Sequence, residues 1–230
     1  MAPAFTVFTH PGTPNGLKLA FLLAELEQAY PKSLPEHRVK VLEMWRLEHR
    51  EPWYLRINPN GKVPAFVHHR PDGVNHAVFE STAIIVYIAQ QFDPEYKLSF
   101  SPKSDEQTEC LEWTFWGHEQ MAPILTLTSQ TLTHPAEEFL LMKKHLLEQM
   151  VDIFGVMNER LEGRDWLVGE GRGMCSIADI SIYPWILVHQ LGGIRDLSVF
   201  PNILRWKTAM EARPGTGGLL MQMVGGVGEQ

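Results

Sequence analysis

The sequence predicts an α/β domain over residues 1–94, a linker over 95–103 and an all-helical domain over 104–220. Three observations predict this division. Short segments with β-type alternation come before Ser104, and helical hydrophobic spacing dominates after it. Between the two, the segment 93–104 (DPEYKLSFSPKS) has the Pro- and Ser-containing composition of a linker.

The first domain has the element order of a split sheet. Four segments are predicted strands: Phe5–Thr9, Arg38–Glu43, Val63–His68 and His76–Phe79. The spacing of the leucines after Gly16 predicts a helix, and Ser81–Phe92 predicts another. Asp72-Gly73 is a hairpin turn signal between the last two strands. The order is therefore βαβ followed by ββα, which is the thioredoxin-like arrangement.

The second domain is predicted to be helical throughout. Ser104 starts a capping-box pattern with Gln107, and Ser176 starts another with Asp179, which we interpret as folding residues. A long helix should bury one face, made of Leu147, Met150, Val151, Phe154, Met157 and Leu161. The Gly-rich end of the chain, residues 221–230, is expected to be a flexible tail.

Composition excludes several classes of function. The chain has 230 residues and a net charge of -7, which argues against a general nucleic-acid binder. No apolar run approaches the ~20 residues that a membrane span requires. Two cysteines, Cys110 and Cys175, predict no disulfide scaffold and favour a cytoplasmic protein. His68 and His69 are neighbours on a strand and point to opposite faces, so we expect no metal site.

The turn Thr13-Pro14-Asn15-Gly16 lies between the first strand and an apolar helix. A helix N-terminus offers unpaired amides and favours an anion. Thr13 and Asn15 add uncharged hydrogen-bond donors, but neither titrates, and no cysteine precedes Cys110. The reactive group should therefore come from a ligand, and a thiolate is the anion for which such donors suffice.

Two further segments of this domain offer complementary ligand groups. Pro64 at the start of the third strand, especially if cis, would turn the backbone of Val63 outward to pair with an extended peptide. Ser81 at a helix start can bind a carboxylate, and Glu80 can bind an ammonium group. A thiol, a peptide backbone, a carboxylate and an amine together describe glutathione.

The motifs TPNGLK, EHREPWYLRINPNGKVPAF, FESTAIIVYIA, EWTFWGHEQMAP and CSIADISIYPW, in this order, resemble those of glutathione transferases. The chain is most similar to the nu class and to the fungal subgroup of the yeast nitrogen-regulator prion protein. The resemblance implies a homodimer that acts on small disulfides or electrophiles, with glutathione and glutathione disulfide as its ligands. It implies these contacts: Asn15 with the sulfur and Thr13 beside it, Val63 before a cis Pro64 with the cysteinyl backbone, His49 and Lys62 with the glycyl carboxylate, and Glu80 and Ser81 with the γ-glutamyl end.

The second domain departs from these relatives. Its pocket for an electrophile or a second glutathione is expected to involve Trp116, Glu119 and Lys144, where relatives carry a Gly-rich stretch and an Arg-Tyr pair. The departures leave two activities open, transferase and disulfide reductase. They also leave an alternative, a glutathione-binding regulatory or ligand-carrying protein. Such a regulator would use a long Asn-rich N-terminal tract, which this sequence does not contain.

Overall fold

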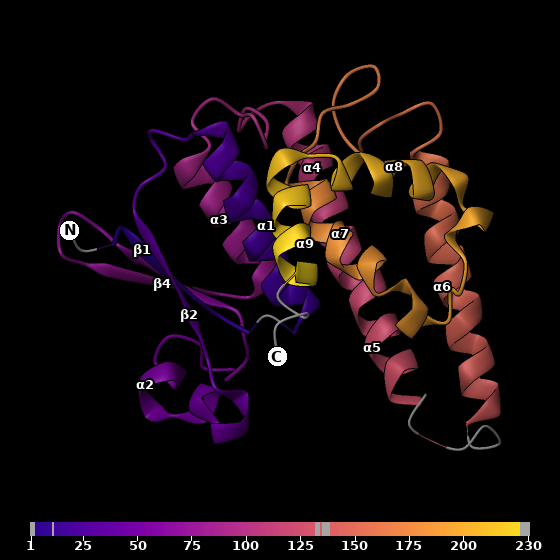
Figure 1. Ribbon diagram of the computed structural model, residues 1–230, viewed down its shortest axis with the longest axis horizontal. Coiled ribbons are helices and arrows are strands. Elements are labelled where there is room, and N and C mark those ends of the chain that lie inside the picture. Colours follow the sequence, from indigo (N-terminus) through magenta and orange to yellow (C-terminus); the bar gives the residue numbers. More distant parts are fainter. Residues whose placement is uncertain (1–2, 11, 132–133, 135–138, 226–230) are drawn as a thin grey trace. The chain divides into compact units, whose positions relative to one another are not determined.

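The computed structural model describes residues 3–10, 12–131, 134 and 139–225. The chain divides into two compact units, Met1–Glu95 and Tyr96–Gln230. The first unit contains a four-stranded sheet, and the second is mainly helical (Figure 1). The fold class predicted from the sequence is therefore confirmed.

The elements of the first unit follow the predicted order. They are β1 (Phe5–Thr9), α1 (Pro14–Ala29), β2 (His37–Val41), the 3₁₀ turns η1 (Met44–Arg46) and η2 (Glu48–Arg50), α2 (Pro52–Leu55), β3 (Ala65–His69), β4 (Asn75–Phe79) and α3 (Ser81–Phe92). The sheet order is β2-β1-β3-β4, with β1 parallel to β2 and antiparallel to β3, and β3 antiparallel to β4. Strand β3 begins two residues later than predicted, because Pro64 has no N–H to donate to the ladder.

Both faces of the sheet are covered. On one face, α1 and α3 pack together (Figure 1), and the Phe5 ring lies 5.2 Å from that of Phe66 and 4.9 Å from that of Phe92. On the other face, Phe8 packs in a buried cluster with Tyr54 of α2 and residues of β3. The alternation of side chains along each strand supplies both layers.

The second unit is built from helices and short helical turns. They are α4 (Asp105–Trp116), the π-helical turn η3 (Gly117–Met121), α5 (Ala122–Thr131), α6 (Leu140–Arg160), α7 (Ile177–Leu187), the 3₁₀ turns η4 (His189–Gly192) and η5 (Leu197–Val199), α8 (Pro201–Glu211) and α9 (Pro214–Gly225). Gly117 lies against α7, because a Cβ atom there would be 2.3 Å from Cγ1 of Ile182. No helix in the described ranges is long and apolar enough to cross a membrane.

Helix α6 buries a different stripe from the predicted one. Met150, Phe154 and Met157 are buried as expected, but Leu147 is 40% exposed and Val151 is 44% exposed. Leu146 and Ile153 take the inward positions instead. The apolar residues of this helix cover more than one face. Periodicity alone therefore did not decide which stripe of side chains faces inward.

The capping predictions have different outcomes. At α7 the capping box forms, and the carboxylate of Asp179 accepts from the backbone N–H of Ser176 at 3.0 Å, that of Leu167 at 3.1 Å and the indole of Trp206 at 2.8 Å. At α4 Ser104 caps Gln107, but the box is not reciprocal. The Gln107 side chain accepts from Phe100 instead, since the Ser104 N–H already donates to Ser101.

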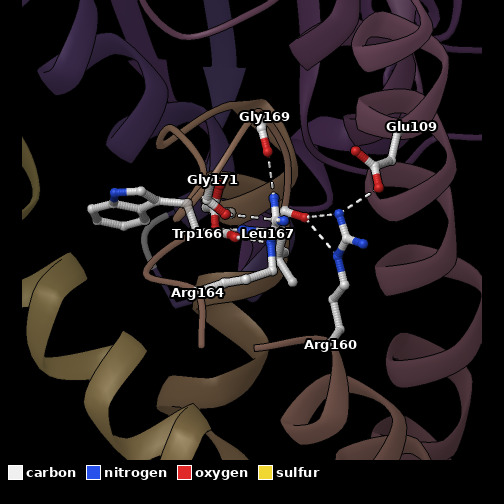
Figure 2. A network of polar contacts seen from close by, with 8 residues as sticks. Glu109, Arg160, Arg164, Trp166, Leu167, Gly169 and Gly171 are labelled. Atoms are coloured by element: carbon white, nitrogen blue, oxygen red, sulfur yellow. Dashed lines mark hydrogen bonds and ion pairs between the residues drawn. The ribbon is translucent and has the colours of Figure 1, made fainter. Parts of the chain in front are cut away.

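The loop between α6 and α7 is fixed by two arginines. Figure 2 shows that Arg160 reaches both the carboxylate of Glu109 and the carbonyl of Leu167. Arg164 donates to the carbonyl groups of Trp166, Gly169 and Gly171. Charged donors thus satisfy carbonyl groups that no regular secondary structure pairs, which fixes this irregular segment.

The chain forms a last helix before its end. Residues up to Gly225 are helical, and Thr216 near the start of α9 is fully buried. The flexibility expected from residue 221 onwards stays a prediction, and 226–230 lie outside the described residues. Packing of the helix start outweighs the low helix propensity of the glycines.

Candidate functional site

Three segments of the first unit meet at the end of its sheet where β1 and β4 finish and β3 starts. Ala65 pairs with Phe8 of β1 and with Phe79 of β4. Continuing this register by one residue places Pro64 beside Glu80. The turn after β1, the residues before β3 and the start of α3 are thereby brought together, although they are far apart in sequence.

Thr13 caps α1. Its backbone is extended, and its hydroxyl accepts from the N–H of Gly16 at 3.1 Å and donates to the carbonyl of His10 at 3.1 Å. A Cβ atom at Gly16 would lie 2.5 Å from the hydroxyl of Thr9. Because the single proton of Thr13 is already used within the turn, Asn15 is the side chain with donors to offer a ligand.

Asn15 joins the first turns of two helices. It is the second residue of α1, and its Oδ1 accepts from Oγ of Ser81, the first residue of α3, at 3.1 Å. No hydrogen bond within the described ranges uses its Nδ2 group, which carries two N–H donors. The site thus combines an amide donor with the N-termini of α1 and α3.

Lys18 extends this contact and was not predicted from the sequence. Its side chain is fully buried, and Nζ donates to Oγ of Ser81 at 3.5 Å. Burial lowers the pKa of Lys18 to about 7, and the carboxylate of Glu80 opposes this shift. Its spacing of three residues from Asn15 places the two on one helix face, which is the only signal that the sequence offered.

The backbone of Val63 is available for pairing. The Val63–Pro64 bond is cis, as the resemblance implied. Nothing in the described part of the chain bonds to the N–H or C=O of Val63. The residue before it is fixed, since the carbonyl of Lys62 accepts from Oη of Tyr54 at 2.7 Å and from Nδ2 of Asn58 at 2.6 Å. Sequence reasoning missed these two anchoring side chains.

Glu80 has an unusual backbone conformation. Its φ is 69° and its ψ is 120°, a region in which a side chain costs of the order of 1–3 kcal/mol. The residue is exposed, and it directly precedes the buried Ser81. Strained residues of this kind cluster at ligand sites, so the conformation marks the start of α3 as a candidate binding position.

His49 and Lys62 both belong to the connection between β2 and β3. His49 in η2 is 9% exposed, and its Nδ1 is buried without a hydrogen-bond partner among the residues that the structure describes. Its backbone carbonyl lies 3.1 Å from the position that a Cβ atom of Gly61 would occupy. The side chain of Lys62 is exposed. Since Nδ1 is enclosed, a ligand would reach the ring of His49 through Nε2.

The residues predicted for a second pocket lie in the second unit. Trp116 ends α4 with its ring 5.0 Å from that of Trp113, and Glu119 is exposed in η3. Lys144 is exposed on α6 and pairs with Glu148 at 3.8 Å. In the described part of this unit, no hydrogen bond or ion pair joins Lys144 to Trp116 or Glu119. This set stays a prediction.

The remaining reactive side chains have local partners. His68 contacts Oη of Tyr87 at 3.0 Å, and His69 contacts Thr6 and Asn75. The described residues contain no group of three or more metal-binding side chains. Cys110 and Cys175 are buried and form no disulfide among the described residues, and burial raises the pKa of the Cys110 thiol to about 11.

The fold defines a protein with a thioredoxin-like domain followed by a helical domain. The chain matches the model of the glutathione S-transferase N-terminal domain over residues 3–90 and that of the C-terminal domain over residues 120–214. It is 32% identical to the disulfide-bond oxidoreductase YfcG of Escherichia coli, over 91% of this chain and 92% of that protein. The chain belongs to the glutathione S-transferase family.

Fungal proteins are also similar. The protein URE2 of Kluyveromyces marxianus is 25% identical over 91% of this chain and 57% of its own length. Among solved structures, the glutathione transferase URE2P6 of Phanerochaete chrysosporium, in complex with oxidized glutathione, has a TM-score of 0.83 and 25% identity. That match covers 96% of each chain. These relatives support the family and do not assign the chain to the nu class.

Proposed function

We propose that the first unit binds glutathione and that the protein is an enzyme using its thiolate against small disulfides or electrophiles. The observation that carries the proposal is the hydrogen bond between Asn15 and Ser81, which unites the N-termini of α1 and α3. Both helix ends favour negative charge, and the free backbone of Val63 lies in the segment beside them. The sulfur, the peptide backbone and the carboxylate of a single glutathione molecule therefore each have a complementary group on the protein.

Asn15 is the proposed donor to the sulfur. A thiol with a pKa of about 8.5 is only about 3% ionised at pH 7. A hydrogen bond to a charged group contributes roughly 1.5–3 kcal/mol, and a helix N-terminus adds roughly 0.3–1 kcal/mol. Together they lower the pKa of the bound thiol by about 2 units, which raises the thiolate fraction about 25-fold.

The other groups hold the ends of the tripeptide. Val63 pairs with the cysteinyl backbone through its N–H and C=O, as in an added strand. Glu80 binds the ammonium of the γ-glutamyl end. Ser81 binds its carboxylate through the backbone N–H at the start of α3, since the hydroxyl proton of Ser81 goes to Asn15. Lys62 and Nε2 of His49 face the glycyl carboxylate. These contacts set affinity, whereas Asn15 sets the ionisation of the sulfur.

The disulfide reaction needs no cysteine of the protein. The bound thiolate attacks one sulfur of a small disulfide, forms a mixed disulfide and expels the other sulfur as a thiolate, which takes up a proton. A second glutathione thiolate then attacks the glutathione sulfur of the mixed disulfide. This releases glutathione disulfide and the second thiol, so that two electrons pass from two glutathiones to the substrate.

Finer properties follow from the resemblance. We propose membership of the nu class or of the subgroup of fungal URE2-like proteins, a homodimeric assembly and a cytoplasmic location. Two buried cysteines that form no disulfide among the described residues are compatible with a reducing compartment. Size-exclusion chromatography with light scattering tests the assembly, since a particle of 52 kDa is twice the chain mass of 26.2 kDa.

The test is titration calorimetry with glutathione and glutathione disulfide, followed by turnover assays with hydroxyethyl disulfide and a panel of electrophiles. Binding with turnover of either substrate class supports the proposal. Binding without turnover favours the regulatory or ligand-carrying alternative. No association with either form of glutathione refutes the proposal as a whole.

A further inference from the structure

A buried lysine is costly, and Lys18 has no role in the function described so far. Desolvation of an ammonium group costs several kcal/mol unless hydrogen bonds compensate for it. A leucine or methionine at this position of α1 would pack without that penalty. Lys18 is nevertheless fully buried beside the start of α3. The position of its Nζ atom therefore needs a reason besides packing.

The hydrogen bonds that start at Lys18 have a defined direction. Nζ donates to Oγ of Ser81 at 3.5 Å, so the hydroxyl oxygen of Ser81 acts as an acceptor there. The single proton of that hydroxyl then points to Oδ1 of Asn15 at 3.1 Å. The amide of Asn15 is thereby oriented with Nδ2, and not Oδ1, on the side away from Ser81.

The ammonium form of the lysine fixes this direction. It has N–H donors and no acceptor, whereas a neutral amine also has a lone pair that accepts hydrogen bonds. The carboxylate of Glu80 is the charged group that acts on Lys18 from α3, and it favours the ammonium form. Since Asn and Gln amides can rotate by 180° with little change in shape, only such a partner decides which end faces a ligand.

We propose that Lys18 is a positioning residue that acts through Ser81 to keep the N–H groups of Asn15 directed at the ligand sulfur. The inference rests on the proposed function, because it concerns the same thiolate. It assigns to Lys18 the stabilisation of one amide orientation and not a contact with glutathione. A rotated amide would present Oδ1 to the sulfur and repel the thiolate.

The experiment measures the pKa of bound glutathione from the ultraviolet absorbance of its thiolate in the wild type, Lys18→Met, Ser81→Ala and the double variant. We expect Lys18→Met to raise this pKa by about one unit, a ten-fold loss of thiolate below the pKa. In the Ser81→Ala background the same change should cause no further rise, because the connection to Asn15 is already lost. Lys18→Arg keeps the donors and should restore most of the shift.

Two controls separate a positioning role from a general loss of structure. The affinity of S-methylglutathione, which has no thiol, should change less than about two-fold in Lys18→Met. Glu25→Gln removes another buried charge two turns along α1 and should leave the thiol pKa unchanged. If Lys18→Met fails to fold, Lys18→Leu, which also has no N–H donor, replaces it in the series.

The outcomes distinguish this inference from the proposed function. If the wild type shifts the thiol pKa but Lys18→Met shifts it equally, the role of Lys18 is refuted and the proposed function stands. An equal rise on removing Lys18 with and without the Ser81 hydroxyl also refutes it, because the effect then bypasses Ser81. If the wild type does not bind glutathione, the proposed function and the role of Lys18 are both refuted.

Discussion

Replacing Asn15 by alanine tests the centre of the proposed site. The substitution removes both Nδ2 donors and leaves the backbone amides of α1 in place. Loss of a hydrogen bond to a thiolate, roughly 1.5–3 kcal/mol, corresponds to a rise of about 1–2 units in the pKa of the bound thiol. The helix terminus still contributes its roughly 0.3–1 kcal/mol, so part of the shift should remain.

The assay is the thiolate absorbance titration, together with the dissociation constant of glutathione from calorimetry above pH 9, where the thiol is largely ionised in both proteins. We expect the pKa to rise and the thiolate fraction, and with it turnover at pH 7, to fall by about 3- to 25-fold. Thr13→Ala is the matched control in the same turn. It removes the cap and should cost about 1–2 kcal/mol of stability while the thiol pKa stays low. An unchanged thiol pKa in Asn15→Ala would refute the assignment of the sulfur position.

Three further changes test other parts of the structure. Asp179→Ala removes the acceptor of the Trp206 indole and of two buried backbone N–H groups. Chemical denaturation should show that the free energy of unfolding falls by about 3–5 kcal/mol, and Asp179→Asn should lower it less. Gly117→Ala forces a Cβ atom against Ile182 and should lower stability by about 1–3 kcal/mol, part of which Ile182→Ala in the same chain restores. The pKa of Lys18 is lowered from 10.5 to about 7, so the unfolded chain binds more protons than the folded chain between pH 7 and 8.5. Over this range wild-type stability should rise by about 2 kcal/mol relative to Lys18→Met, and parallel profiles would contradict the lowered pKa.

The strands and helices of the first unit could be predicted because their signals are local. Phe5–Thr9 and Ser81–Phe92 have the bounds that their hydrophobic spacing and caps indicate. Strand β3 was misplaced by two residues, since the start of a strand depends on pairing with its neighbours as well as on residue type. Element type is thus set locally, and element ends are set by tertiary contacts.

The errors in the second unit have the same origin. The inward face of α6 cannot be chosen from its sequence, because Leu147 and Val151 are as apolar as the buried Leu146 and Ile153. The packing partners decide which stripe is covered. Helix α9 forms although it is glycine-rich, and Thr216 near its start is buried.

The candidate site also contains residues with local sequence signals and one residue that only tertiary contacts identify. Asn15, Val63 and Ser81 could be proposed because a cap, a proline and a helix start are visible in the sequence, and each has a restricted set of physical roles. Lys18 could not be predicted, since a lysine at the fifth position of an apolar helix normally extends its ammonium group to water. Only the proximity of α3 shows that this one ends at Ser81, 63 positions away. A side chain whose role is to orient another one leaves no motif of its own, so positioning residues have to be read from hydrogen-bond direction in the folded chain.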